Sequence, residues 1–331
     1  MLSTLQNKEK LFHNEIPPLP SGKYAHIIVL RKTESFSLFQ TDGELNTVRV
    51  SKGLTKDNQE SFSRLVMFKR KQSSPERLKG RELLRAYSVV EKCEYNSENF
   101  CKKCPDCIMY GFAIGSQGSE KSKVLVDSCF SISGYDVSHQ QIIFNGLHEW
   151  GTMTEKGVQR DSFGEQDHVL PQVYFPAIVT VKDPTEFTFS YIFSSLMKTK
   201  RYGAQNTRTG SVENIIVGVI FSDSEIFSNL KLSQALYDYL SENNKLNFPL
   251  NQKDVEDGMN KVIPELLNSD ATKISLKLIG ASSESLIKEF IEISSNEDKF
   301  KELLVKANEQ AITYCKTHGV ESGNKKSKKK E

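Results

Sequence analysis

The chain has 331 residues, enough for one large domain or two ordinary ones, and its 37% hydrophobic and 26% charged residues are typical of a globular protein with a sizeable core. It has no apolar run long enough to span a membrane and no apolar segment after the charged start that would serve as a secretory signal, so a cytoplasmic protein with no membrane partner is expected. The net charge is only +2, but residues 64–85 are markedly basic and residues 222–300 acidic, which suggests either a polyanion-binding face or simply solvated surfaces.

The order of the expected elements indicates an α+β fold class. Apolar runs predict strands, and leucines among strong helix formers predict helices. Residues 186–193 alternate strictly between apolar and other side chains, which is typical of a half-buried strand. Strands are expected at 23–31, 64–70, 122–132, 172–181, 186–193 and 215–221, a helix at 78–87, a projecting hairpin or loop at 135–170, helices after 222 and a disordered lysine-rich tail at the end.

Four of the six cysteines, Cys93, Cys101, Cys104 and Cys107, follow one another with the spacing C-x7-C-x2-C-x2-C. Thiolates this close in sequence can converge on one soft cation, and a tetrahedral four-thiolate site is usual for zinc. The alternatives are two disulfides, which are disfavoured in a cytoplasmic protein, four unrelated thiols, or an iron–sulfur cluster, which is weaker because the closing C-x3-C-P is missing. The spacing therefore predicts a structural zinc site that folds a loop and does no chemistry.

A basic, glycine-bearing loop precedes the last predicted strand. Lys200, Arg201 and Arg208 supply positive charge, Tyr202 offers a stacking face for an unpaired base, and Gly203 lets a backbone amide approach a phosphate. A tight turn between two elements is the alternative interpretation. The loop is neither a Walker A loop nor G-x-G-x-x-G.

Two other segments have weaker signals. Residues 77–81 open the predicted helix with basic side chains and could seat a phosphate, although plain surface charge is equally consistent. Catalytic signatures are absent, since no metalloprotease, hydrolase or kinase motif is present. Asp42, in an Asp-Gly turn, could hold a metal for phosphodiester cleavage, although a solvated turn aspartate is the more common case.

Three of these segments, in this order, resemble the RAMP (Cas-seven) superfamily of CRISPR proteins, and within it the backbone subunits that coat guide RNA. Residues 78–85, LKGRELLR, resemble the family's G-S-S-L-K-G-x-L-R helix start without its two serines. Residues 110–127 resemble its F-G…S-R-V-x-x-x-D strand entry, and residues 201–212 its glycine-rich loop. The cysteine cluster, GTM at 151–153 and RYGA at 201–204 together resemble the type I-D backbone subunit of the Cascade complex.

The resemblance implies a domain plan for one RAMP-type chain. An RRM-like (ferredoxin-like) core is expected, with a zinc-binding insertion, a thumb-like hairpin, a helical part and a disordered basic tail. These parts are expected at 20–92, 124–134 and 171–221 for the core, 93–123 for the insertion, 135–170 for the hairpin, 222–319 for the helical part and 320–331 for the tail.

The resemblance also implies a function and partners. Copies of the chain would stack head-to-tail along one guide RNA (crRNA), grip its backbone, and flip out a base at each hairpin. The remaining bases would then pair with a target DNA strand, so that base pairing and not this protein reads the sequence. Other type I-D Cascade subunits are implied as further partners.

Site residues are carried over by position. The implied RNA contacts are Lys79, Arg85, Lys200, Arg201, Tyr202, Gly203 and Arg208, with Met153 in the hairpin as the base wedge. Related subunits that cut target RNA carry a loop aspartate, and Asp42 lies in roughly the corresponding region without the surrounding pattern. We therefore expect a structural subunit with no catalytic residue, and a metal-dependent single-strand nuclease using Asp42 is the alternative.

Overall fold

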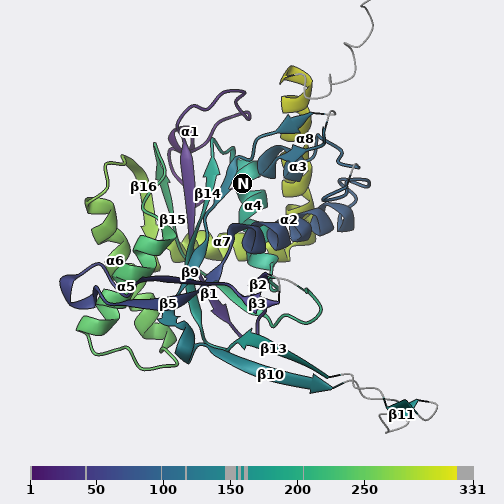
Figure 1. Ribbon diagram of the computed structural model, residues 1–331. Helices are drawn as coiled ribbons and strands as arrows, with labels where there is room; N and C mark the ends of the chain where they lie inside the picture. Colours follow the sequence, from purple (N-terminus) through teal and green to yellow (C-terminus); the bar gives the residue numbers. More distant parts are fainter. Residues whose placement is uncertain are drawn as a thin grey trace, which may run out of the picture.

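The computed structural model describes residues 2–41, 43–97, 99–115, 118–145, 154–155, 158–159, 163–203 and 205–318. The described residues form an α+β fold, with several antiparallel sheets and most of the helical residues in the last third of the chain (Figure 1). In chain order the elements are α1 Lys8–Leu11, β1 Tyr24–Thr33, β2 Gln40–Thr41, β3 Glu44–Leu45, β4 Thr47–Ser51, η1 Lys56–Asn58, β5 Ser61–Met67, α2 Lys69–Ala86, α3 Pro105–Tyr110, β6 Phe112–Ala113, β7 Ser119–Glu120, β8 Val124–Val126, β9 Cys129–Gly134, η3 Tyr135–Val137, β10 His139–Asn145, β11 Thr154–Glu155, β12 Val158–Gln159, β13 Phe163–Val169, β14 Tyr174–Lys182, α4 Glu186–Lys198, β15 Val212–Ser222, α5 Asn229–Glu242, α6 Gln252–Asn268, β16 Ile274–Ile279, η4 Gly280–Ser283, α7 Glu284–Ser295 and α8 Glu297–His318.

The main sheet has five strands in the order β16-β15-β1-β14-β8, and every neighbouring pair is antiparallel. The first strand of the sequence therefore lies in the middle, between two strands from the second half of the chain. β8 forms one edge and pairs with β14 only from Val179 to Val181.

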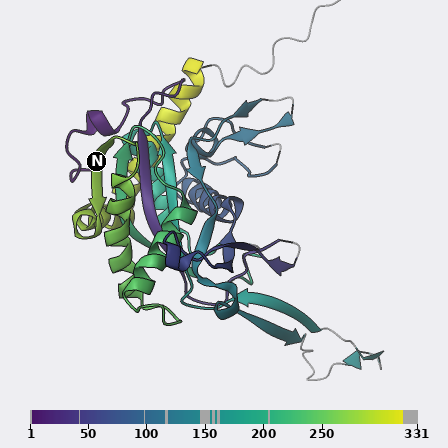
Figure 2. The same cartoon turned by 60° about the vertical axis from the view of Figure 1, so that its left-hand side comes forward.

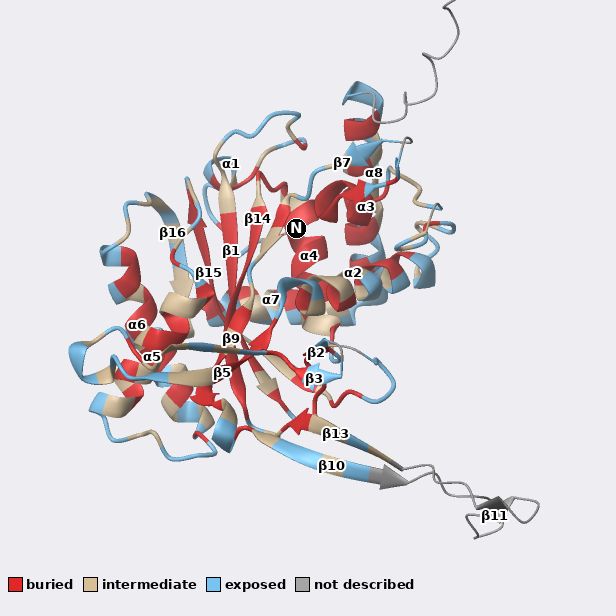
Figure 3. Cartoon of the chain, in the orientation of Figure 1, coloured by how far each residue is buried: buried red, intermediate tan, exposed pale blue. Residues whose placement is uncertain are grey.

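Helices cover both faces of this sheet. Side chains of β1 alternate between two cores, with Ala25, Ile27 and Val29 in one and Ile28 and Leu30 in the other. The first core is completed by α2, α4, α7 and α8, and the second by α5 and α6. Figure 3 shows the resulting buried residues running along the strands. Within the described residues, both faces of the sheet are therefore largely covered.

Smaller sheets extend from this body. The three strands β4-β5-β9 form a second antiparallel sheet. β10 and β13 pair from His139↔Val169 to Asn145↔Phe163 and form an arm that projects from the body (Figure 1). In Figures 1 and 2 the cysteine-bearing segment, α2 and this arm follow one another along the same side of the molecule.

One strand expected from the sequence is a helix. Residues 186–193 form the start of α4, which begins with a capping box between Thr185 and Thr188. Every residue from Thr188 to Leu196 is buried. The alternating aromatic residues therefore do not mark one buried face of a strand, as their spacing had suggested. A helix that is buried on all sides does not need the apolar residues at every third or fourth position that mark a half-exposed helix.

Other boundaries also differ. The helix expected to begin near residue 78 begins at Lys69, and the preceding strand ends at Met67. The strand expected at 122–132 is two strands, β8 and β9, in different sheets. The helical part after residue 222 includes one strand, β16, at the edge of the main sheet. Among the described residues, every helix is too short or too polar to cross a membrane.

Candidate metal centre and nucleic-acid interface

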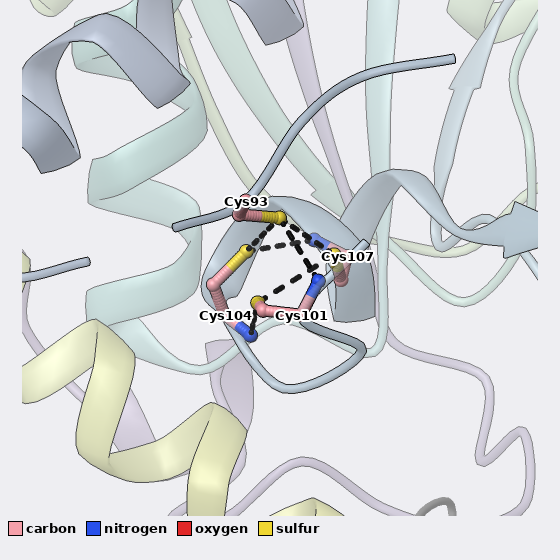
Figure 4. A group of neighbouring side chains, drawn as sticks. All are labelled: Cys93, Cys101, Cys104 and Cys107. Carbon is pink, nitrogen blue, oxygen red and sulfur yellow. Dashed lines mark hydrogen bonds between the residues drawn. The ribbon is translucent and has the colours of Figure 1, made fainter. Parts of the chain in front are cut away.

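The four clustered cysteines converge (Figure 4). Their sulfur atoms all lie within 4.8 Å of one another. Cys93 Sγ is 3.5 Å from Cys107 Sγ and 3.7 Å from Cys104 Sγ, and Cys101 Sγ is 3.9 Å from Cys107 Sγ. Zinc–sulfur bonds of about 2.3 Å in a tetrahedron separate the sulfurs by about 3.8 Å. The cluster therefore has the size and the donor set to hold a metal ion.

Local backbone contacts bring the sulfurs together. Lys102 has a positive φ of 64° in the turn between the second and third cysteines. The Cys101 amide donates to Cys93 Sγ at 3.3 Å, the Cys104 amide to Cys101 Sγ at 3.3 Å, and the Cys107 amide to Cys104 Sγ at 3.5 Å. Cys104 is also the N-cap of α3, with Pro105 in the first turn of that helix. The short spacings between cysteines thus form a compact knuckle.

Hydrogen bonds within the sulfur cluster favour a thiolate at Cys93. The Cys101 thiol, followed by those of Cys104 and Cys107, holds the pKa of Cys93 well below its usual range, whereas the contact with Cys101 raises the pKa of Cys104 and of Cys107. Three of the cysteines are buried and Cys101 is half-buried, so the sulfurs are largely removed from water. Thiolates are the form that binds a soft metal.

A charged pair outside the cysteine set lies beside the cluster and was not predicted from the sequence: Arg81 contacts the sulfurs, and Asp106 contacts Arg81. Arg81, on α2, lies 2.7 Å from Cys93 Sγ through Nη1. Asp106, between the last two cysteines, lies 2.5 Å from Arg81 Nη2 and 2.9 Å from Arg77 Nη2. The only sequence signal was that Arg77 and Arg81 are one helical turn apart and so share a face of α2.

The basic run at 64–85 is not a single solvent-facing surface. Arg64 is fully buried and donates to the backbone oxygens of residues 52, 131 and 132, and Arg81 is buried against the sulfur cluster. Lys79 is half-buried and pairs with Glu82 at 2.8 Å, whereas Arg85 is exposed. Residues 77–81 also lie in the middle of α2, so the phosphate seat predicted at a helix start there is wrong.

Three cations of the glycine-bearing loop are exposed, as a nucleic-acid contact requires. Lys200, Arg201 and Arg208 all lie on the surface. Arg201 Nη1 donates to the backbone oxygen of Thr209, which closes the loop across its base. The Thr209 hydroxyl donates to the Tyr202 carbonyl oxygen at 2.9 Å and reinforces this closure. The loop thus presents its charges from a braced backbone.

Tyr202 does not offer a stacking face, so that prediction is wrong. Its ring is fully buried, and its hydroxyl lies 3.1 Å from Glu76 Oε1 and 2.8 Å from Asn214 Nδ2. Glu76 Oε1 also accepts from Arg31 Nη2 at 2.6 Å, and both of these side chains are fully buried. Burial raises the pKa of Glu76, and the contacts from Arg31 and Tyr202 oppose this rise. Tyr202 therefore anchors the loop to α2 and the main sheet.

Gly203 is also used internally. Its φ is +95°, and a Cβ there would lie 2.2 Å from the Leu38 carbonyl oxygen. Its amide donates to the Lys71 carbonyl oxygen at 3.3 Å. The glycine is required because the loop packs closely on another segment, and its amide is already engaged. The predicted phosphate contact by this amide is therefore wrong.

Two predicted site residues, Asp42 and Met153, lie outside the described residues.

A groove of about 700 Å³ lies between the first half of α2, β8 and the connection from β15 to α5. Lys69 and Arg70 are among its lining residues, together with Ser73, Ser74 and Tyr95, so it offers cations, hydroxyls and aromatic rings. This groove was not predicted from the sequence, because its walls come from segments far apart in the chain. The glycine-bearing loop contacts α2 at Lys71, directly after two of the groove's cations, Lys69 and Arg70.

Comparison with known proteins identifies the family to which the chain belongs. The family model described as Csc2 Crispr matches residues 11–304. No curated protein matches the sequence significantly. The crystal structure of Thermofilum pendens Csc2 shares the fold, with a TM-score of 0.59 and 14% identity over 93% of this chain and 95% of that chain.

Two further solved structures are more distant. A chain of a CRISPR RNA-guided surveillance complex gives a TM-score of 0.45 at 11% identity, covering 75% of this chain and 86% of its own length. A chain of such a complex described as pre-nicking gives 0.47 at 9% identity, covering 75% and 89%.

Proposed function

The chain belongs to the Csc2 CRISPR family, and from this premise we propose that it is a crRNA-binding backbone subunit of a type I-D interference complex. The observation that carries the proposal is the family match, which spans residues 11–304 and so includes the sulfur cluster, α2, the arm and the glycine-bearing loop. The partners under this proposal are crRNA, the target DNA strand, further copies of the chain stacked head-to-tail, and the other subunits of the complex, in the cytoplasm.

The core is proposed to be ferredoxin-like (RRM-like). The order β1-α2-β8-β14-α4-β15 along the chain, with the sheet order β15-β1-β14-β8, supports this assignment. Free RRM domains stack bases on the open face of their sheet. Here α5 and α6 cover that face, so the RNA must be held elsewhere on the molecule.

We assign the grip to cations at or near the surface, which would contact phosphates. Lys200, Arg201 and Arg208 project from the braced loop, and Lys79 and Arg85 lie on the second half of α2. Phosphate contacts hold a strand without reading its bases, which is what a subunit that binds any guide sequence needs. Tyr202 and Gly203 act indirectly in this scheme, by fixing the loop.

The arm is proposed to act as the thumb that interrupts the guide. Its strands β10 and β13 project from the body (Figure 1), and in this proposal they contact a neighbouring copy or the bound strand. Met153, near its tip in the sequence, is proposed as the wedge that flips one base out per copy. The remaining bases stay available for pairing with target DNA.

The cysteine cluster is proposed to hold a structural zinc ion through Cys93, Cys101, Cys104 and Cys107. The sulfur spacing and the four-thiolate donor set support this choice. With all four positions filled by sulfur, the ion would supply structural stability and no open coordination site for catalysis. Its role is to fold the insertion at 93–123 beside α2.

Nuclease protection of crRNA purified with this protein and its native complex tests the proposal. Copies that coat one guide should leave a regularly spaced footprint, with one accessible nucleotide per copy. Purified complex without RNA would contradict the backbone role. Metal-dependent degradation of the RNA that is lost in an Asp42→Ala variant would instead favour a single-strand nuclease.

A further inference from the structure

Arg81 is a buried cation that faces the sulfur cluster from outside the cysteine segment. Its Nη1 lies 2.7 Å from Cys93 Sγ and its Nη2 3.6 Å from Cys107 Sγ, and the residue is only 2% exposed. We infer that Arg81 is a positioning residue of the metal site, which holds two of its thiolates through N–H···S hydrogen bonds and compensates their charge.

Asp106 fixes the direction of the Arg81 guanidinium. Both carboxylate oxygens are engaged, with Oδ2 2.5 Å from Arg81 Nη2 and Oδ1 3.2 Å from Arg77 Nε. Arg77 Nη2 also donates to the Gly111 carbonyl oxygen at 2.8 Å, just beyond α3. The guanidinium of Arg81 is thus held by an anion on one side, which leaves Nη1 directed at Cys93.

The position of α2 is what brings Arg81 to this depth. At Gly80, a Cβ would lie 2.3 Å from the Tyr191 hydroxyl oxygen and 2.9 Å from Ser195 Oγ, both on α4. A glycine here lets α2 approach α4 more closely than any other residue would permit. The next residue, Arg81, is therefore buried with α2 and reaches the cluster from the core.

The charge of the site explains why such a cation is needed. Four thiolates outweigh the charge of one divalent ion, and the excess negative charge would lie among buried residues, where it is costly. A guanidinium within hydrogen-bonding distance offsets this charge and orients the ligands. A simple ion pair with Asp106 would not account for Nη1, which is directed at sulfur and not at the carboxylate.

Metal competition tests the assignment, which rests on the zinc site proposed above. The full-length Arg81→Met protein, purified under reducing conditions, should lose zinc to a chromophoric chelator at a concentration about 10- to 100-fold lower than the parent requires. Arg70→Met, the same change at an exposed position of the same helix, should match the parent. A folded Arg81→Met protein that retains zinc as well as the parent would overturn the inference.

Cobalt provides a readout that loss of packing alone would not produce. In the cobalt(II)-loaded protein, N–H···S bonds lower the energy of the sulfur electrons, so Arg81→Met should move the sulfur-to-metal charge-transfer band to longer wavelength. Arg81→Lys, which keeps the charge, should recover part of the zinc retention. If Arg81→Met does not fold, Arg81→Lys decides, because a lysine that equals the parent in both assays would overturn the inference. A parent protein that binds neither metal would refute the zinc site itself.

Discussion

The cysteine cluster and the glycine-bearing loop are built in opposite ways, although both pack against α2. The cluster gathers its functional groups from one short segment and buries them. The loop exposes its functional groups and depends on buried residues from distant parts of the chain, among them Arg31 and Glu76. The comparison shows that functional residues and the residues that position them need not be near one another in sequence.

α2 takes part in both arrangements through different residues. Glu76 anchors the loop, and Arg81 contacts the sulfurs slightly more than one turn later. The helix therefore links a compact, locally formed centre to a loop that is fixed by long-range contacts. Variants that disturb one region and spare the other test whether the two are as separate as their construction suggests.

The largest effect is expected at the cluster. Replacing Cys104 and Cys107 by serine removes two of four ligands, so bound metal should fall from about one ion per chain to none. The insertion at 93–123 should become sensitive to protease, while circular dichroism reports a folded core. Cys129→Ala, at a buried thiol outside the cluster, should keep the metal. Unchanged metal content in the double variant would refute the four-cysteine site.

The next effect is expected at the anchor of the loop. Glu76→Gln leaves the buried Arg31 guanidinium without its anion, and the free energy of unfolding should fall by about 3–5 kcal/mol. Urea denaturation measures this loss. Glu82→Gln, on an exposed part of the same helix, should cost less than about 1 kcal/mol. Equal losses for the two variants would mean that the buried anchor has no special role.

A third effect is expected in RNA binding. Reversing the charge of Lys200, Arg201 and Arg208 to glutamate should weaken binding of single strands on the order of 100-fold at low salt, regardless of base sequence. The slope of log affinity against log salt should become shallower by about 2, because three phosphate contacts are lost. Fluorescence anisotropy measures both quantities. Reversing Lys261, Lys288 and Lys301 gives the same net charge on other helices and should leave the slope nearly unchanged. A loss confined to one RNA sequence would indicate base readout by the loop.

The smallest effect is expected at Tyr202, where a change in stability distinguishes a buried ring from an exposed ring that stacks on RNA. Tyr202→Phe keeps the ring and removes only the hydroxyl, which contacts Glu76 and Asn214. Thermal or urea unfolding should show a loss of about 1 kcal/mol. A tyrosine that stacked on RNA from an exposed position would lose no stability in the free protein, so an unchanged unfolding midpoint would restore the stacking interpretation.

What the sequence could predict follows from the same contrast. The four cysteines were predicted as a set because short spacing alone brings them together, and in the structure they lie within reach of one ion. The metal's identity stays a prediction. The burial of Arg81 and Asp106 beside the cluster was not predicted. Charged residues in a basic helix and in a polar loop are usually exposed, and no pattern in the sequence marks these two as buried. Their depth is set by packing against α4, which the sequence does not display.

The fold was predicted to the level of its class. An α+β chain with antiparallel strands and late helices was expected and is confirmed. The residues of α4 were assigned to a strand because their aromatic alternation implies one buried face, whereas the helix is enclosed by α2, α7 and α8. Tyr202 was assigned to the surface because it stands among cations, and only its distant partners reveal that it is buried. Both errors concern contacts between segments far apart in the chain.

The central place of β1 has a consequence for how the protein is made. This strand leaves the ribosome well before both of its partners, Tyr174–Lys182 and Val212–Ser222, which lie more than 140 and nearly 180 residues later in the sequence. A long loop must close before the sheet can form, which slows folding. Until then β1, apolar on both faces, is exposed in the nascent chain and open to aggregation. We therefore expect a chain truncated before residue 212 to require a chaperone, because its middle strand lacks one of its two neighbours.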